Sequence, residues 1–280
     1  MPEIGEIRAH AERLETSFAG RTLAGFRPIT FYVLKTFSPD PSLAHGQTLN
    51  SVSTRGKYLR MYFDDVVFVV HLMQGGRLRP DEKQAAKPRG GQARWTFDDG
   101  SALLLTESGT DKRAGVWVVD SDADLDQTEP LSRLGPDANT VTPEVLQSIL
   151  GEHSMRIHGL LRRQGIIAGI GRRLANDICH RAKISPFAMS GKLDDDQVSA
   201  LHQAIGACID DSLKFERDQT DIVASKKRPS AVHNKTGEAC LTCDDTIREV
   251  AYAKYTVNYC AACQTGGKVL ADNTTSKFLK

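Results

Sequence analysis

Two Cys-x-x-Cys pairs near the end of the chain constrain its folding more than any other feature. Cys240 and Cys243 form the first pair, and Cys260 and Cys263 follow after sixteen intervening residues. Four thiolates at this spacing are typical of two knuckles that hold one Zn²⁺ ion tetrahedrally, and a closed set of four indicates a structural metal rather than a catalytic one. A redox pair or unrelated thiols is the alternative. The sequence therefore predicts structural zinc, with a small β-hairpin over residues 247–259.

The charge of the chain is balanced overall but not locally. The 280 residues, enough for two domains and a small module, include 36 Lys and Arg against 35 Asp and Glu, which gives a net charge of +1. This balance does not by itself indicate a polyanionic partner. Between Glu152 and Asp177 there is no acidic residue, and five arginines lie in this window: Arg156, Arg162, Arg163, Arg172 and Arg173. The window predicts either contact with a phosphate backbone or a solvated helix face.

Hydropathy and cysteine usage exclude several classes of protein. No apolar run approaches the roughly 20 residues that a membrane span needs, and the N-terminus lacks the apolar core of a signal peptide. The paired cysteines favour metal ligation in a reducing compartment over disulfides. Cys179 and Cys208 stand alone in helical patterns and are expected to be buried structural thiols. We therefore expect a soluble intracellular protein with no membrane partner.

The period of the apolar residues changes along the chain. Residues 3–18 predict an amphipathic helix, and short strands follow over 58–63, 66–72, 95–97, 102–106 and 116–119. Beyond an acidic segment with two prolines, helices are predicted over 143–150, 155–163, 174–182 and 194–215, and the polar residues 219–238 predict a loop. These patterns predict an α+β fold with a β-rich domain over 1–120, a linker over 121–136, a helical domain over 137–230 and the four-cysteine module over 231–280.

The N-terminus reads Met1-Pro2-Glu3. An initiator Met before a small residue such as Pro is normally removed, so the mature chain is expected to begin with the secondary amine of Pro2, with the carboxylate of Glu3 beside it. A free amine can act as a nucleophile and form an imine with a carbonyl carbon. The sequence therefore indicates imine chemistry at the amino terminus.

Several motifs in chain order resemble the bacterial formamidopyrimidine-DNA glycosylase and endonuclease VIII family. They are Met1-Pro2-Glu3-Ile4-Gly5-Glu6, Arg55-Gly56-Lys57-Tyr58-Leu59, His71-Leu72-Met73, Gly169-Ile170-Gly171 with the helix and Ile184-Ser185-Pro186 after it, and the final four-cysteine finger preceded by Lys235-Thr236-Gly237-Glu238. The resemblance implies an N-terminal β-sandwich capped by a helix, a helix-two-turns-helix DNA-binding domain and a β-hairpin zinc finger. It also implies a base-excision-repair glycosylase with abasic-site lyase activity on damaged double-stranded DNA, in the bacterial cytoplasm and on the nucleoid, with a monomer as the default.

The resemblance also implies roles for individual residues. Pro2 would attack the anomeric carbon of a damaged nucleoside, displace the base and form an imine with the opened sugar, and Glu3 would protonate the ring oxygen or a departing group. Lys57 would donate a proton and contact a phosphate during elimination. Glu6 matches a second carboxylate at the start of the helix, where it favours the helix dipole.

DNA contacts follow from the same resemblance. A damaged base must leave the base stack before its glycosidic bond can be broken, and in the family a side chain fills the void that it leaves. Met73 or Gln74, just after His71, would fill this void. Lys112 and Arg113 lie near the two further void-filling positions.

The sequence departs from the family pattern at three positions. Ala114 stands where many relatives have an aromatic wedge, Arg172 where many have the Asn that binds the phosphate next to the lesion, and Tyr255 where an Arg usually contacts that phosphate. Arg172 can still bind phosphate, and Lys254 adjoins Tyr255 but alternates to the other face of a strand. The sequence thus supports base excision and the first elimination more strongly than the second elimination.

Two other hypotheses about the function remain open. A damaged-DNA-binding protein of the same fold with weak or no catalysis would account for the three departures, although it leaves Pro2, Glu3 and Lys57 without a role. A zinc-finger transcription regulator would account for the cysteines alone. The base preference is not encoded in a recognisable pattern, although residues 219–230 occupy the place of the loop that covers the everted base in relatives.

Overall fold

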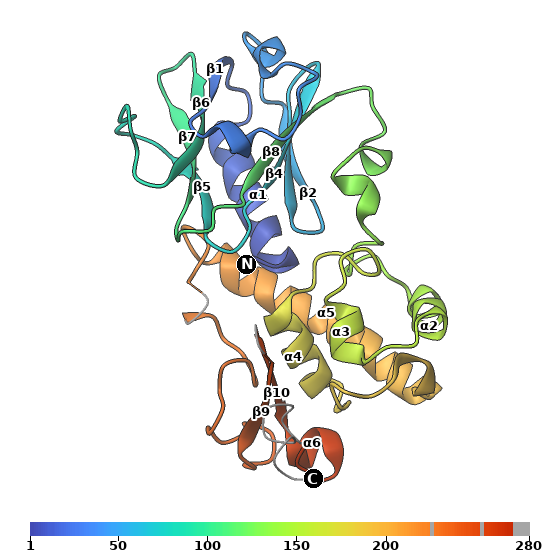
Figure 1. Ribbon diagram of the computed structural model, residues 1–280. Coiled ribbons are helices and arrows are strands. Elements are labelled where there is room, and N and C mark those ends of the chain that lie inside the picture. The colour runs from blue at the N-terminus through green and yellow to red at the C-terminus, as the bar shows by residue number, and fades with distance from the viewer. Residues whose placement is uncertain (225–226, 253–254, 271–280) are drawn as a thin grey trace. The chain divides into compact units, whose positions relative to one another are not determined.

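The computed structural model describes residues 1–224, 227–252 and 255–270 (Figure 1). The chain divides into two compact units. The N-terminal unit contains Met1–Arg133 and Phe215–Ile222, and the C-terminal unit contains Leu134–Lys214 and Val223–Lys280. The four-part division predicted from the sequence stays a prediction.

The N-terminal unit is a β-sandwich with one long helix. One antiparallel sheet has the strand order β1-β6-β7-β5, and the other has the order β2-β3-β4-β8. The elements are α1 (Ile4–Phe18), β1 (Leu23–Pro28), β2 (Ser51–Arg55), β3 (Tyr58–Tyr62), β4 (Val66–His71), β5 (Gly76–Pro80), β6 (Gly91–Phe97), β7 (Ala102–Glu107) and β8 (Gly115–Asp120), with short 3-10 helices at Phe31–Val33, Pro41–Ala44, Leu125–Gln127 and Leu131–Arg133.

One hydrophobic core joins α1 to both sheets. The apolar residues of α1 that recur at helical spacing, such as Leu14 and Phe18, are buried together with Phe68 of β4 and Trp95 of β6. Residues at alternate positions of β3 are buried, which is the pattern of a strand with one face on a core. The predicted helix and the strands β3, β4, β6, β7 and β8 are confirmed. Strands β1, β2 and β5 were missed because Gly, Pro, Ser and Arg interrupt their apolar alternation.

The C-terminal unit combines helices with a terminal hairpin. Its elements are α2 (Pro143–Glu152), α3 (Ile157–Leu161), α4 (Arg172–Arg181), a 3-10 helix (Ser190–Lys192), α5 (Asp195–Arg217, whose last three residues belong to the N-terminal unit), β9 (Ile247–Tyr252), β10 (Tyr255–Cys260) and α6 (Ala261–Thr265). Buried Leu160, Ile178 and Ile205 contribute to its core. The predicted helices are confirmed, but α3 is shorter than the predicted 155–163 because Met155 and Arg156 pair with Met189 and Ser190 in an extended conformation. No helix in the described part of the chain is both long and apolar enough to cross a bilayer.

The predicted hairpin between the cysteine pairs is also confirmed. Strands β9 and β10 are antiparallel, with Val257 directly opposite Val250 and Tyr255 opposite Tyr252. Val250 and Val257 are 2% and 1% exposed, so they form the apolar centre of the hairpin. Tyr252, predicted to join that centre, is half-buried and packs against its edge.

Candidate functional site

The start of α1 fixes residue 2 beside two buried carboxylates. Glu3 is the N-cap residue of α1 and its side chain accepts a hydrogen bond from the backbone N–H of Glu6, while Oε2 of Glu6 accepts one from the N–H of Glu3 at 2.8 Å. This reciprocal arrangement is a capping box, and the positive end of the helix dipole favours both carboxylates there. Glu3 and Glu6 are 2% and 0% exposed, and Pro2 is buried as well. Glu6 therefore holds the backbone that carries Pro2 and Glu3.

Lys57 and His71 lie close to the amino terminus. Lys57 occupies the two-residue turn between β2 and β3, next to the first residue of β3, and Gly56 closes this hairpin with a positive φ of 57°. His71 ends β4 opposite Tyr58, the first residue of β3, and their ring centroids are 4.5 Å apart. Burial, followed by the nearby charges of Lys57 and the terminal amine, lowers the pKa of His71 to about 4. His71 is consequently neutral at pH 7.

The protonation of His71 is further defined by its backbone contact. Its Nδ1 accepts a hydrogen bond of 3.1 Å from the N–H of Met73, so the neutral ring carries its proton on Nε2. Met73 has a positive φ of 53° and is half-buried, whereas Gln74 is exposed. Of the two candidates for filling a void in DNA, Gln74 thus has the more accessible side chain.

A second loop, between β7 and β8, carries Lys112, Arg113 and Ala114. The carboxylate of Glu107, 3% exposed, accepts hydrogen bonds of 2.7 Å from the backbone N–H groups of both Arg113 and Ala114. Arg113 is exposed and forms an ion pair with Asp111. Ala114 is fully buried in the sandwich core. The side chain at position 114 therefore faces inward, and the loop presents Lys112 and Arg113 instead of an aromatic wedge.

In the C-terminal unit, Gln164 shapes the turn that precedes α4. Its amide donates to the carbonyls of Arg162 and Ile170 at 2.9 and 2.8 Å, and its Oε1 accepts from the N–H of Gly169 at 3.0 Å. Gly169 has a positive φ of 100°, which glycine adopts without strain. The turn sets Arg172 at the first position of α4, where the helix dipole attracts anions. No motif in the sequence marks Gln164 for this role.

Tyr255, which stands at the position of the family's finger arginine, is covered by an arginine from another element. The guanidinium carbon of Arg162, at the end of α3, lies 4.3 Å from the centroid of the Tyr255 ring. The Tyr252 ring stacks on Tyr255 with centroids 4.7 Å apart, and the His158 ring is roughly parallel to it at 6.3 Å. Sequence alone placed Arg162 in the basic window but could not show that it meets the hairpin. Lys254, the other candidate there, lies outside the described residues.

His158 connects this aromatic cluster to the start of α4. It is 3% exposed, and burial together with the charge of Arg162 lowers its pKa to about 3. The charge of Arg172 also contributes to this lowering of the pKa. Asn176, fully buried on α4, donates to Nδ1 of His233 at 2.9 Å if that nitrogen is unprotonated. In the C-terminal unit Arg162, His158 and Tyr255 thus form one cluster.

The four cysteines come together as predicted. All their sulfur atoms lie within 4.8 Å of one another, and three pairs, Cys240–Cys263, Cys243–Cys260 and Cys243–Cys263, are 3.9, 3.4 and 3.3 Å apart. Zinc–sulfur bonds of about 2.3 Å put the ligands of a tetrahedral site roughly 3.8 Å apart, so the arrangement suits zinc. The Nε2 atom of His180 lies 3.3 Å from the sulfur of Cys240. Burial raises the pKa of Cys240, but hydrogen bonds from the Thr242 backbone and His180 outweigh it and lower that pKa to about 6.

Comparisons with known proteins identify the family. Residues 1–113 match the formamidopyrimidine-DNA glycosylase N-terminal domain. A Mycobacterium tuberculosis protein described as an uncharacterized formamidopyrimidine-DNA glycosylase-like protein is 41% identical over 149 residues, 52% of this chain and 94% of the relative. The formamidopyrimidine-DNA glycosylase of Chloroflexus aurantiacus is 27% identical over 274 residues, 94% of this chain and 98% of the relative.

The fold agrees with that of a solved structure of the same kind. Lactococcus lactis Fpg in complex with DNA that contains an abasic site superposes with a TM-score of 0.83 at 21% identity, over 94% of this chain and 99% of that one. The sandwich, the helical unit and the cysteine hairpin together define the α+β fold of this class. This chain belongs to the formamidopyrimidine-DNA glycosylase family.

Proposed function

We propose that this protein is a base-excision-repair DNA glycosylase and abasic-site lyase that removes damaged bases from duplex DNA through an imine to Pro2. The observation that carries this proposal is the start of α1, where the capping box holds residue 2 next to the buried carboxylate of Glu3. Lys57 and neutral His71 lie near the same terminus. A nucleophile, a carboxyl group and a cation are the groups that the reaction needs.

The chemistry begins when Met1 has been removed and Pro2 presents a free secondary amine. Its nitrogen attacks the anomeric carbon of the damaged nucleoside, the bond to the base breaks, and the base leaves with the electron pair and takes up a proton. The bond between the anomeric carbon and the ring oxygen then breaks as Glu3 delivers a proton to that oxygen, which leaves an iminium on Pro2.

The iminium is an electron sink that acidifies the neighbouring sugar carbon. Loss of a proton from that carbon and departure of the 3′ phosphate cut the strand, and water then hydrolyses the imine to release Pro2. In this proposal Lys57 would contact the phosphate and exchange the protons of this step, and His71, neutral with its proton on Nε2, would donate a hydrogen bond beside it.

The C-terminal unit supplies the phosphate contacts in this proposal. Arg172 at the first position of α4 and Arg162 over the Tyr255 ring present two guanidinium groups that suit phosphate oxygens. Arg162 would then provide the charge that the sequence lacks at Tyr255, and the stacked ring would hold that charge in place. The four thiolates of the finger would bind zinc and so order the hairpin that carries Tyr255.

Borohydride trapping tests the proposal. The mature protein is incubated with a duplex that contains one abasic site, in the presence of sodium borohydride, which reduces an imine to a stable covalent adduct visible on a denaturing gel. We expect an adduct with the wild type and none with Pro2→Ala. Glu12→Gln, a substitution on the exposed side of the same helix, serves as a matched control that keeps the adduct.

The same gel distinguishes the alternative function. A wild-type protein that shifts the duplex in a binding assay but never forms the adduct would be a damaged-DNA-binding protein with little catalysis. An adduct that persists in Pro2→Ala would assign the imine to another amine, with Lys57 as the first to test.

A further inference from the structure

A buried histidine from outside the finger contacts one sulfur of the four-cysteine cluster. His180 lies in the last turn of α4 and is 6% exposed, and its Nε2 atom is 3.3 Å from Sγ of Cys240. This distance is within hydrogen-bonding range for a sulfur atom. Helix α4 also packs against β10, the strand that ends at Cys260 (Figure 1). The contact therefore joins α4 to the metal-binding end of the hairpin.

Metal binding decides which atom of this contact carries the hydrogen. Cysteine binds Zn²⁺ as a thiolate, which has no S–H to donate. The ring nitrogen must then be the donor, so Nε2 of His180 carries a proton whether the ring is neutral or cationic. With zinc in the finger, the contact becomes an Nε2–H···Sγ hydrogen bond from His180 to Cys240.

A histidine so close to a cysteine sulfur could instead be a ligand of the metal. Two atoms bound at about 2.0 and 2.3 Å from one zinc ion can lie at most about 4.3 Å apart. In the described part of the chain, the donor atoms that all lie within 4.8 Å of one another are the four cysteine sulfurs, and His180 does not belong to this group. His180 is therefore placed outside the set of four ligands, against one of them.

The charge of the cluster gives this hydrogen bond a purpose. Four thiolates and one Zn²⁺ ion sum to two negative charges, and N–H donors to sulfur stabilise that charge. Within the finger, Cys240 accepts hydrogen bonds from the backbone N–H groups of Thr242 and Cys243. His180 adds a side-chain donor from a different element, so the charge of the metal site is also offset from α4.

We infer that His180 is a positioning residue of the finger: its Nε2–H donates to the Cys240 thiolate, strengthens zinc binding and fastens the loaded finger to α4. The inference rests on the zinc that the proposed function places in the finger. Zinc binding and docking of the finger on α4 then favour each other, because the thiolate that the metal requires is also the acceptor that His180 requires. Loss of a hydrogen-bond partner of a metal ligand typically lowers metal affinity about 10–100-fold.

Zinc affinity of the full chain, measured by competition with a chelator of known affinity, tests this role. His180→Phe keeps a buried ring but loses the donor, and should bind zinc about 10–100-fold more weakly than the wild type. His180→Gln places an amide N–H near the position of Nε2 and should recover most of that loss. The matched control is His202→Phe, which removes a histidine contact of 2.9 Å to the Val141 carbonyl on α5 and should leave zinc affinity unchanged.

NMR of the protein loaded with a spin-active cadmium isotope in place of zinc detects the hydrogen bond itself. A scalar coupling between cadmium and the Nε2–H proton of His180, transmitted through the sulfur, is expected in the wild type and in His202→Phe. A histidine that only packs against the finger would give no such coupling. A cadmium resonance at the position typical of three sulfur ligands and one nitrogen would make His180 a ligand and overturn the inference.

The two measurements also separate this inference from the proposed zinc site. If cadmium binds the wild type without coupling to His180, or if His180→Phe binds zinc as tightly as His202→Phe, the role of His180 is refuted and the zinc finger stands. A wild-type chain that takes up neither metal would refute both.

Discussion

Asp177 of α4 is expected to anchor the segment that leads into the finger. Its Oδ1 accepts from the backbone N–H groups of Ala231 and Val232 at 3.1 Å each, and both its oxygens lie 2.7 Å from the hydroxyl of Ser230. The side chain is 7% exposed, and Val232 is fully buried in the small core that contains Cys240 and Cys260. One carboxylate thus ties the finger core to α4.

The cost of removing this carboxylate follows from its contacts. A hydrogen bond to a charged group contributes about 1.5–3 kcal/mol, and a buried N–H left without an acceptor costs about 1–3 kcal/mol. Two backbone donors lose their acceptor in Asp177→Ala, so local opening of residues 230–233 should become about 3–5 kcal/mol easier. Because 1.4 kcal/mol is a factor of ten, amide protection at Val232 should fall roughly a hundredfold to several thousandfold.

Amide hydrogen exchange followed by NMR measures this protection directly. Asp177→Asn keeps one acceptor oxygen and should lose only about 1–2 kcal/mol. Asp211→Asn, which removes an exposed ion pair with Arg181, is the matched control and should change protection at Val232 by less than tenfold. Exchange at Val232 that is as slow in Asp177→Ala as in this control would refute the reasoning.

Three further predictions concern the finger, pH and a glycine. Chelation of zinc should abolish duplex binding and the dispersed NMR signals of the hairpin around Cys240, because the finger core is too small to fold alone; signals unchanged after verified metal removal would contradict this. The pKa of His71 is about 4 in the fold and about 6.5 when unfolded, so the unfolded state takes up the proton first, and stability falls by up to about 3 kcal/mol as pH drops from 6.5 to 4. Urea unfolding should show this slope diminished in His71→Gln. Gly76→Ala would place a Cβ 2.0 Å from the Leu72 carbonyl oxygen and should prevent soluble folding, whereas Gly151→Ala, with no atom within 4 Å on helix α2, should be neutral or stabilise by about 0.5–1 kcal/mol in thermal unfolding.

Local patterns in the sequence accounted for the parts of the protein that depend on near neighbours. The helix after Glu3, the strands built from apolar runs and the hairpin between the cysteine pairs all form as predicted, because period and spacing are properties of a short segment. The four cysteines converge for the same reason, since each knuckle sets its own two sulfurs. Strand β5 was missed because Leu78, between two arginines, is its one large apolar residue, and only the pairing with β7 makes this segment a strand.

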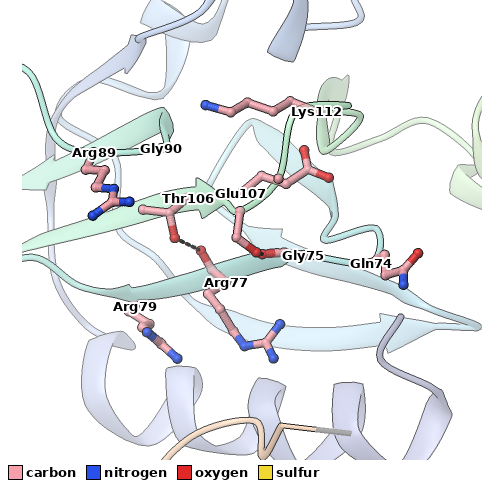
Figure 2. A pocket seen from close by; sticks show the side chains of 11 residues that line it. Gln74, Gly75, Arg77, Arg79, Arg89, Gly90, Thr106, Glu107 and Lys112 are labelled. Carbon is pink, nitrogen blue, oxygen red and sulfur yellow. Dashed lines mark hydrogen bonds between the residues drawn. The ribbon is translucent and has the colours of Figure 1, made fainter.

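Contacts between distant segments were decided only by the tertiary structure. The sequence showed an arginine missing at Tyr255, but only the packing of α3 against the hairpin puts Arg162 over that ring. Likewise, Ala114 was interpreted from the sequence as the loss of the family's aromatic wedge. Only the packing of the sandwich core shows that its side chain faces inward. Arg77, Arg89 and Lys112 are a further case, because they come from three separate segments and line one pocket (Figure 2) only through the way that the strands pair. A site formed by residues that are neighbours in the sequence can be predicted from the sequence. A cluster of charged side chains from several strands depends on how those strands pair.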